Sequence, residues 1–383
     1  MSLSMSKALA CVIARGGTSK GLIVQRVDLP RDARLRDALL CDLFGSPDRR
    51  QVDGLGGADT LTSKVAIVGP PSRPDADIDY LFGQVSIEEP KVDYGGTCGN
   101  MLSAVAAYAI DEGFAPACDP LTRVRVHAVN IARVITADVQ TSGGRVVEEG
   151  DAAIAGVPGT GAPIMLDFAD TIGCLTGRLL PTGRMRDRME VEGVGVCEAS
   201  VIDAGSSMVF VRGADFGVDP MSGPAEIDQD SALLAKLERV RRAFAAHAGI
   251  VGPDRRPSTN APLICLADPP IRYSPYGGGA AIEGSEMHLR ARAIFMGRLH
   301  KALGVSDAVP TAVAALLAGT VVHEVARLPW ASTHVLIGHP SGIMRCDIVA
   351  GVKPGDFQAI RLVRTSRRLM TGLASLRAER ARG

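Results

Sequence analysis

The sequence predicts an α+β protein of two lobes, and three observations lead to this prediction. The chain has 383 residues, which is too long for one ordinary core and suits two domains of roughly 150–200 residues. Both halves contain many short strand patterns that end at Gly- and Pro-rich turns. Each half also contains an apolar helical stretch. We place the first lobe at residues 1–184 and the second at residues 185–383, with the boundary near Pro181–Arg188.

The first half opens with two strand patterns around a tight loop. The runs Ala8–Ala14 and Gly21–Val27 are typical of strands, and they flank the Gly-rich loop Arg15–Lys20, which indicates a hairpin-like turn. Further strands are expected at Ser63–Val68, Ile78–Glu88, Val124–Val139 and Gly144–Glu149. The helix of this half is expected at 98–111, because its apolar residues recur every three to four positions and Gly113 ends it.

The second half of the chain shows the same kind of pattern, with short strands and apolar or amphipathic helices. A strand pair is expected at Cys197–Arg212, with Asp203–Gly205 in its turn, and an amphipathic helix at Asp230–His247. Later strands are expected at Leu263–Leu266, Arg290–Met296, Thr333–Ile337 and Met344–Val349. The apolar helix of this lobe is expected near 309–318, so that Pro310 and Thr311 would stand at its head.

Composition argues for a function located in a site. Lys+Arg and Asp+Glu both total 42 and aromatic residues make up 4%, which gives no case for a nucleic-acid or anionic-membrane partner. No apolar run approaches the ~20 residues of a membrane span, and residues 1–10 show no secretory signal. The eight cysteines occur singly, without a Cys-x-x-Cys pair. We therefore expect a cytoplasmic protein with reduced thiols, one of which is available for chemistry.

The segment Gly95–Asn100 is a candidate catalytic loop. Its glycines let the backbone approach a ligand, and Cys98 falls at the predicted helix start, where unpaired N–H groups and the helix dipole favour a thiolate. The same N–H groups, at Gly99 and Asn100, suit a substrate carboxylate. A thiol in such a place can remove and return a proton. The alternative interpretation is a buried structural cysteine.

The tripeptide Thr-Ser-Lys occurs twice next to Gly-rich loops, at Thr18–Lys20 and at Thr62–Lys64. Lysine is a compact cation that serves as acid, base or carboxylate anchor, and the chain has only seven. Lys64 opens an apolar strand, which favours a functional role for it over that of an ordinary solvated lysine. Thr18, Ser19, Lys20 and Ser63 are candidate substrate-binding residues in these two loops, together with Arg15.

Other chemistries find less support in the residues. Gly17–Gly21 matches the Gly-x-Ser-x-Gly elbow of serine hydrolases, but that motif requires a helix after the turn, and Leu22–Val24 is a strand pattern. Dispersed histidines offer no metal-ligand spacing, and no Gly-x-Gly-x-x-Gly stands between a strand and a helix, so we expect no metal and no nucleotide cofactor.

The second half offers two weaker candidates for anion binding. His300 and Lys301 follow a predicted strand, and Ser341 and Gly342 lie in a Pro-Ser-Gly turn between two strands. A lone histidine is more often a structural hydrogen-bonding group, and such a turn is more often an ordinary one.

Taken together, these motifs resemble the signature of the PrpF-type isomerases. The matching segments are Arg15–Gly21, Gly56–Asp59 with Thr62–Lys64, Cys98–Asn100, Gly156–Thr160, Leu180–Gly183 and Asp203–Gly205. The family includes isomerases of 2-methylaconitate, aconitate and methylitaconate, and a 4-oxalomesaconate tautomerase. The resemblance implies a diaminopimelate-epimerase-like fold of two pseudo-symmetric lobes, each a curled, mostly antiparallel sheet around a central helix, with the active site between the lobes.

The resemblance also implies an acid–base pair at Lys64 and Cys98. Epimerases of this fold have a second cysteine at the head of the second helix, which is absent here, so a two-thiol racemase is disfavoured. We therefore expect a cofactor-independent 1,3-proton shift on a small unsaturated di- or tricarboxylate, with the substrate and the identity of the base left open. A serine hydrolase and a non-catalytic carboxylate-binding protein are the alternatives, and a homodimer is expected by family analogy.

Overall fold

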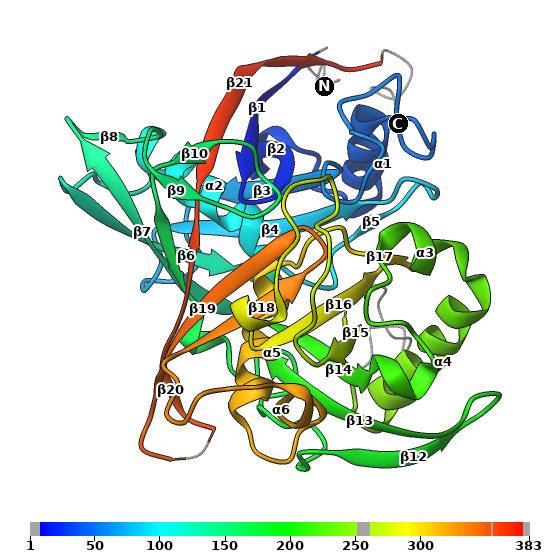
Figure 1. The fold of residues 1–383 in the computed structure, drawn as a ribbon. Coiled ribbons are helices and arrows are strands. Elements are labelled where there is room, and N and C mark those ends of the chain that lie inside the picture. Colours follow the sequence, from blue (N-terminus) through cyan, green and yellow to red (C-terminus); the bar gives the residue numbers. More distant parts are fainter. Residues whose placement is uncertain (1–7, 251–260, 354, 378–383) are drawn as a thin grey trace. The chain divides into compact units, whose positions relative to one another are not determined.

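The computed structural model describes residues 8–250, 261–353 and 355–377 (Figure 1). The chain divides into two units: unit 1 comprises residues 1–153, 159–165 and 364–383, and unit 2 comprises residues 154–158 and 166–363. This division differs from the predicted boundary at residue 184. The segment from residue 166 belongs to unit 2, where Gly173 N–H donates to Asp203 O (2.8 Å) and Asp203 N–H donates to Leu179 O (2.9 Å). The last strand instead returns to unit 1.

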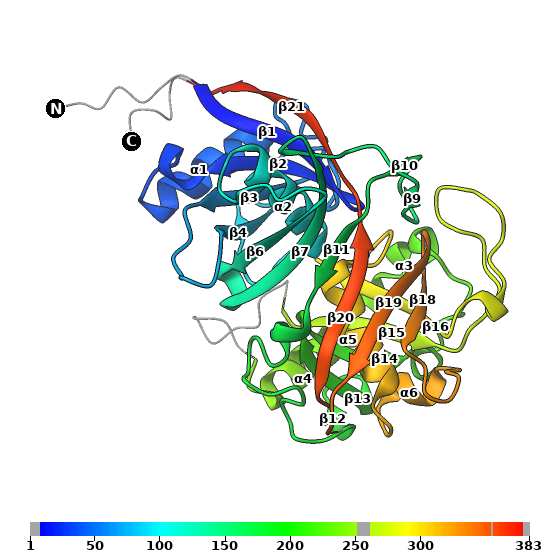
Figure 2. The ribbon, with the colours of Figure 1, turned by 90° about the vertical axis from the view of Figure 1, so that its left-hand side faces the viewer.

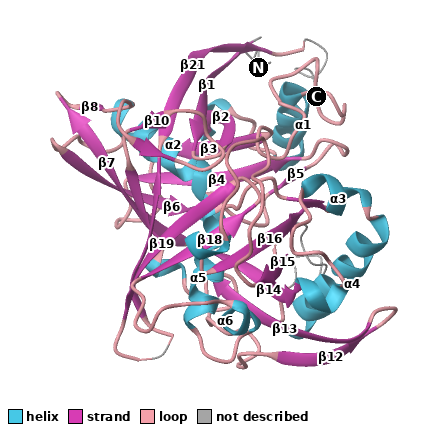
Figure 3. Ribbon diagram, in the orientation of Figure 1, coloured by secondary structure: helices cyan, strands magenta, loops and turns pink. Residues whose placement is uncertain are grey.

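Strands and loops make up most of each unit (Figure 3). The strands of unit 1 are β1 (Ala8–Gly16), β2 (Ser19–Gln25), β3 (Lys64–Gly69), β4 (Ile78–Val85), β5 (Val92–Asp93), β6 (Leu121–Ala128), β7 (Arg133–Ser142), β8 (Arg145–Val146), β9 (Ala152–Ala153), β10 (Thr160–Gly161) and β21 (Ser366–Ser375), and its helices are η1 (Arg26–Asp28), α1 (Ala33–Phe44), α2 (Gly99–Asp111) and η2 (Val129–Ile131). β21 runs antiparallel beside β1 along its whole length (Figure 2).

Unit 2 contains β12 (Asp187–Val191), β13 (Gly195–Ala204), β14 (Ser206–Arg212), β15 (Leu263–Asp268), β16 (Leu289–Phe295), β17 (Arg298–Leu299), β18 (His334–His339), β19 (Gly342–Ala350) and β20 (Phe357–Arg364). Its helices are η3 (Ala169–Thr171), η4 (Gly213–Phe216), α3 (Pro224–Gln229), α4 (Ser231–His247), η5 (Gly284–Glu286), α5 (Val305–Leu316) and α6 (Val321–Val325). β11 (Ile164–Asp167) and the end of β20 fall on the division between the units.

The two units repeat one order of strand pairing. In unit 1 the pairs β1–β2, β3–β4 and β6–β7 are antiparallel, while β2–β3 and β4–β6 are parallel. In unit 2 the pairs β13–β14, β15–β16 and β18–β19 are antiparallel, while β14–β15 and β16–β18 are parallel. This repetition confirms the predicted pseudo-symmetric, mostly antiparallel α+β fold.

Each repeat has one helix enclosed by its sheet and one outside it. All residues of α2 from Gly99 to Ile110 are buried, as are those of α5 from Val305 to Ala315. α1 packs on the opposite face of the unit 1 sheet, with Leu40 and Phe44 among Val65 and Ile67. α4 occupies the corresponding place in unit 2. The enclosed helices α2 and α5 are therefore the two central helices.

The head of α5 lies four residues before the predicted one. The prediction placed Pro310 near the helix start, where proline is common, but Pro310 lies inside α5 and Gly304 is the N-cap residue. A proline inside a helix cannot donate to the carbonyl one turn earlier, which is that of Ser306. Ser206 Oγ donates to this carbonyl instead, at 3.2 Å. The helix head thus offers Gly304 and Val305, again without a cysteine.

None of the helices in the described ranges combines the length and the apolarity that a bilayer-spanning segment needs. All eight cysteines are free thiols.

Candidate active site

Cys98 is the N-cap residue of α2, as the sequence predicted. Its side chain makes no capping hydrogen bond, so the N–H groups of the first helical turn have no side-chain partner from this residue. Its Sγ lies 3.9 Å from Ser19 Oγ, and the residue is buried. Its carbonyl accepts from Leu102 N–H (3.0 Å) and from the hydroxyl of Tyr80 (3.2 Å). Burial, followed by the proximity of Cys98, raises the pKa of Tyr80 well above its usual value, so this hydroxyl remains a donor.

Lys64 lies on the face of the unit 1 sheet that contacts α2. Its register partner across the parallel pair β2–β3 is Gly21, where a Cβ atom would lie 3.0 Å from Met101 Cε of α2. Lys64 is only 4% exposed, and its Nζ donates to Gln84 Oε1 at 2.6 Å. The same Nζ lies 5.2 Å from the centroid of the Phe82 ring. A buried amine and a buried thiol therefore share the α2 side of one sheet.

The β1–β2 hairpin fits closely against the first turn of α2. A Cβ atom at Gly16 would lie 2.2 Å from Asn100 O, so only glycine fits there. Asn100 Nδ2 donates to Thr18 Oγ1 at 3.0 Å. Asn100 Oδ1 is buried and has no hydrogen-bond partner among the described residues. The turn therefore places Thr18, Ser19 and Asn100 around Cys98, with one polar atom left for a ligand.

Arg15 and Lys20 lie on the other face of this hairpin. They are register partners, whereas Gly16 pairs with Ser19, and successive residues of a strand face opposite sides. Arg15 Nη1 donates to Thr365 O and Thr365 Oγ1, both at 3.0 Å. The structure therefore does not bring Arg15 and Lys20 together with Cys98, and their expected contact with the substrate stays a prediction.

Ser63 is buried and donates to Gln51 Oε1 at 2.7 Å, and Ala58 N–H donates to the same oxygen at 2.8 Å. These two donors orient the amide of Gln51, whose Nε2 is buried and has no partner among the described residues. Ser63 therefore serves to position Gln51, which offers its own N–H groups to a ligand.

A second group of predicted residues comes together in unit 2. Ser341 Oγ donates to the carbonyl of Lys301, and Ala302 N–H donates to His300 Nδ1 at 3.1 Å. Lys301 Nζ lies 5.7 Å from the centroid of the Tyr276 ring. A Cβ atom at Gly342 would lie 2.4 Å from Ala155 Cβ, so this turn also needs a glycine.

Sequence reasoning missed Tyr80, Phe82, Gln84 and Gln51. The first three alternate along β4 and share the face that meets Lys64 and Cys98. A glutamine within an apolar strand was the available signal, because a polar side chain that is buried needs a partner. Gln51 lies in a loop, and no pattern in the sequence distinguishes it.

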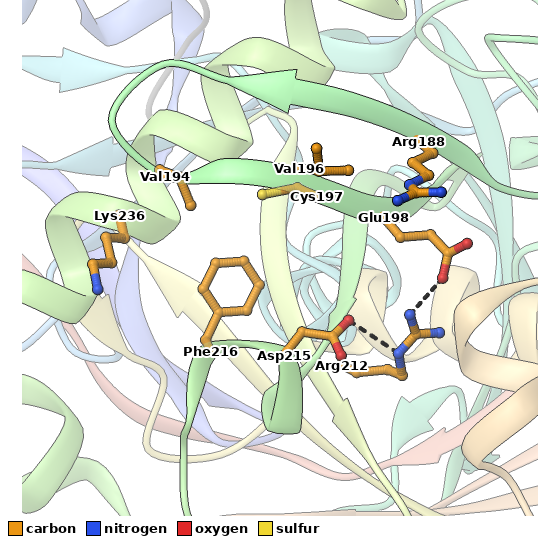
Figure 4. A pocket seen from close by; sticks show the side chains of 9 residues that line it. All are labelled: Arg188, Val194, Val196, Cys197, Glu198, Arg212, Asp215, Phe216 and Lys236. Carbon is orange, nitrogen blue, oxygen red and sulfur yellow. Dashed lines mark hydrogen bonds and ion pairs between the residues drawn. The ribbon is translucent and has the colours of Figure 1, made fainter.

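A pocket of about 550 Å³ in unit 2 contains none of the predicted residues (Figure 4). It is lined by Arg188, Val194, Val196, Cys197, Glu198, Arg212, Asp215, Phe216 and Lys236. Arg212 is already held by Glu198, by Asp215 (3.0 Å) and by Glu324 (2.9 Å). Burial, followed by the charge of Asp215, raises the pKa of Cys197, which makes it a poor nucleophile. Nothing in this pocket suits proton transfer on a polycarboxylate.

Within the described ranges, no three His, Cys, Asp or Glu side chains gather as metal ligands. The described residues around Cys98 and Lys64 offer a thiol, an amine, hydroxyl groups, amide groups and backbone N–H donors.

Several proteins that are similar to this chain are named as isomerases or tautomerases. The chain is 40% identical to the 3-methylitaconate isomerase of Eubacterium barkeri, over 97% of each chain. It is 38% identical to the 4-oxalomesaconate tautomerase of Pseudomonas putida, over 96% of each. A crystal structure of methylitaconate-delta-isomerase superposes with a TM-score of 0.78 and 39% identity, covering 98% of this chain and 97% of that one.

A hydroxyproline epimerase from Agrobacterium vitis has the same fold, with a TM-score of 0.57 and 11% identity over 99% of this chain and 96% of that one. The family model described as PrpF protein matches residues 6–377. The chain therefore belongs to the PrpF family of proteins.

Proposed function

We propose that this protein is a cofactor-independent isomerase that catalyses a 1,3-proton shift on a small unsaturated di- or tricarboxylate, such as 2-methylaconitate, aconitate, methylitaconate or 4-oxalomesaconate. The observation that carries the proposal is the placement of Cys98 at the head of α2 and of buried Lys64 on the same side of the sheet. The isomerase and tautomerase names of the similar proteins support the reaction class.

The proposed reaction uses Lys64 and Cys98 as a pair. One of them removes a proton from the allylic carbon, and the electron pair of the broken C–H bond delocalises through the double bond into a carboxylate. The other delivers a proton to the far carbon of the three-carbon unit, where the new C–H bond forms. The N–H groups at the start of α2 stabilise the charge that develops on the carboxylate. Gln51 Nε2 supplies a further N–H donor to the substrate.

The serine hydrolase alternative loses support in the structure. Ser19 begins β2 after a hairpin, whereas a nucleophile elbow lies between a strand and a helix. A Ser-His-Asp cluster elsewhere in unit 1 also fails geometrically, because Ser72 Oγ and Asp79 Oδ1 both contact Nδ1 of His127, at 3.2 Å and 2.8 Å. A triad needs one partner on each ring nitrogen.

We also propose that the enzyme is a homodimer in the cytoplasm and has no nucleic-acid or membrane partner. Equal numbers of acidic and basic residues support the absence of a polyanionic partner. For unit 2, we propose that His300, Lys301, Ser341 and Gly342 bind substrate.

We expect turnover of one member of a panel of cis- and trans-aconitate, 2-methylaconitate, methylitaconate and 4-oxalomesaconate, followed by ultraviolet absorption and proton NMR. In deuterated water, deuterium should enter the new C–H position, because the acid of the pair exchanges with solvent. Tight binding of a panel member without any spectral change would instead identify a carboxylate-binding protein. Ester cleavage that is lost in Ser19→Ala would identify a hydrolase.

A further inference from the structure

One of the contacts of Lys64 is a hydrogen bond to the neutral side chain of Gln84. Gln84 faces Lys64 directly across the antiparallel pair β3–β4, and the distance from Lys64 Nζ to Gln84 Oε1 is 2.6 Å. Gln84 is completely buried. The hydrogen bond therefore lies away from water, where its geometry and strength count most.

The orientation of the Gln84 amide is fixed by its other contacts. Its Nε2 donates to the carbonyls of Thr60 (3.2 Å) and Ser63 (3.0 Å). Turning the amide over would place its oxygen against these two carbonyl oxygens and its NH₂ group against the amine of Lys64. The acceptor oxygen must therefore face Lys64 in every protonation state of the lysine.

This arrangement has a consequence for proton transfer. One N–H of Lys64 is always directed to Gln84 Oε1, so the remaining positions on Nζ, including the lone pair of the neutral amine, are directed elsewhere. A carboxylate in place of the amide would favour the ammonium form through its full charge, whereas an amide favours it only through a dipole. Burial of the amine opposes the charged form, whereas the Phe82 ring, whose centroid is 5.2 Å from Nζ, favours it.

We propose that Gln84 is a positioning residue that aims Lys64 and, because it is uncharged, keeps both the amine and the ammonium accessible during the catalytic cycle. This inference rests on the proposed acid–base function of Lys64. It assigns to Gln84 a part in an isomerisation in which the same group takes up a proton in one direction of the reaction and gives up a proton in the other.

Other titratable groups occupy the elements around Lys64. They are Lys20 on β2, Tyr80 on β4, Asp93 on β5, Asp59 in the preceding loop and Cys98 at the head of α2. Asp93 pairs with Gln84 across β4–β5, so Gln84→Glu also places a second carboxylate beside Asp93, whereas Gln84→Met adds no charge. The two variants are therefore compared with each other as well as with the wild type.

Two substitutions of Gln84 should shift the protonation equilibrium of Lys64 in opposite directions. Gln84→Met keeps the volume and removes the acceptor, so we expect Lys64 to lose its proton about one pH unit lower than in the wild type. Gln84→Glu supplies a carboxylate, so we expect Lys64 to lose its proton about one pH unit higher than in the wild type. The second oxygen of this carboxylate would face two carbonyl oxygens, which keeps the shift at the low end of the usual range. The alkaline limb of kcat/KM against pH should move in the same two directions.

The measurement that does not depend on catalysis is an NMR titration of protein containing isotope-labelled lysine. The chain has only seven lysines, and the Lys64 signal is identified by its loss in Lys64→Met. Gln25→Met is the matched control, because it removes another side-chain amide of unit 1, one that bonds Tyr108 OH at 3.3 Å. This control should leave the Lys64 titration and the pH profile unchanged.

Opposite shifts in Gln84→Met and Gln84→Glu support the inference, and an unchanged Lys64 titration in both overturns it. If Gln84→Met does not fold, Gln84→Glu decides alone: an upward shift supports the inference and no shift rejects it. Full activity of Lys64→Met would reject the acid–base role of Lys64, and with it the proposed function, while the titration still decides whether Gln84 controls the proton on this lysine.

Discussion

Cys98→Ser should lower kcat by about 10²–10⁴-fold while leaving the protein as stable as the wild type or slightly more stable. The loss of rate follows because a hydroxyl is a far weaker acid than a thiol and cannot exchange a proton with the substrate near neutral pH. The unusual part of the expectation is the stability. Cys98 is the N-cap residue of α2 and makes no capping hydrogen bond, whereas serine is one of the preferred N-cap residues.

Cys98→Ala separates the two effects. Alanine removes the acid–base group as serine does, but it cannot cap, so it should be about 0.5–2 kcal/mol less stable than Cys98→Ser. Both variants should be equally inactive. Denaturant unfolding and steady-state kinetics measure the two quantities, and Cys118→Ser, at an exposed thiol, is the control that should change neither. Retention of more than a tenth of wild-type kcat in Cys98→Ser would remove the thiol from the mechanism.

The missing N-cap hydrogen bond at Cys98 lowers local stability in favour of the proposed activity. A thiol at the N-cap position forgoes a hydrogen bond that serine would make, so the sequence carries a small local cost at the residue proposed for catalysis. Proteins accept such costs where activity needs a particular group. The absence of a cap also leaves the first-turn N–H groups available for a carboxylate.

The position of Cys98 was predictable because two independent local signals coincide. Gly-rich residues precede it, and apolar residues recur at helical spacing after it, so the start of α2 was fixed to within one residue. The head of α5 was misplaced because the prediction followed the apolar residues from Val309 onward, and Ser306 and Asp307 interrupt the apolar pattern before them. An internal proline is unfavourable by local preference alone, and the tertiary hydrogen bond from Ser206 makes it acceptable.

The faces of the β1–β2 hairpin were beyond the reach of sequence reasoning. Arg15, Lys20 and Ser19 lie in one short loop motif, but a shift of one residue along a strand reverses the side it faces. Only the observed register shows that Ser19 meets Cys98 and that Arg15 does not. Gln84 was missed for a related reason, since its partner Lys64 lies 20 residues away in the chain and across a strand pair.

Gly16→Ala should reduce kcat/KM by about 100-fold although residue 16 carries no reactive group. The backbone of Gly16 does not have the positive φ that disfavours alanine, so the effect is steric. An added Cβ would lie 2.2 Å from Asn100 O and 3.1 Å from Ser103 Oγ, and real Cβ atoms do not come within 3.0 Å of another atom. The first atom belongs to the backbone of α2, so the hairpin or the helix head must move.

Such a movement separates the groups that this junction aligns. Ser19 and Cys98 lie on the two sides of it, and a displacement of about 1 Å is enough to cost a reaction two orders of magnitude. The cost in unfolding free energy should be smaller, about 1–3 kcal/mol, as for other overpacked positions. Gly372→Ala on β21 is the matched control, because the nearest atom to its added Cβ is Met370 Cε at 3.6 Å. Normal kcat/KM in a destabilised Gly16→Ala protein would show that the fit between the hairpin and α2 supports the fold alone, and that the head of α2 is aligned for catalysis by something other than this glycine.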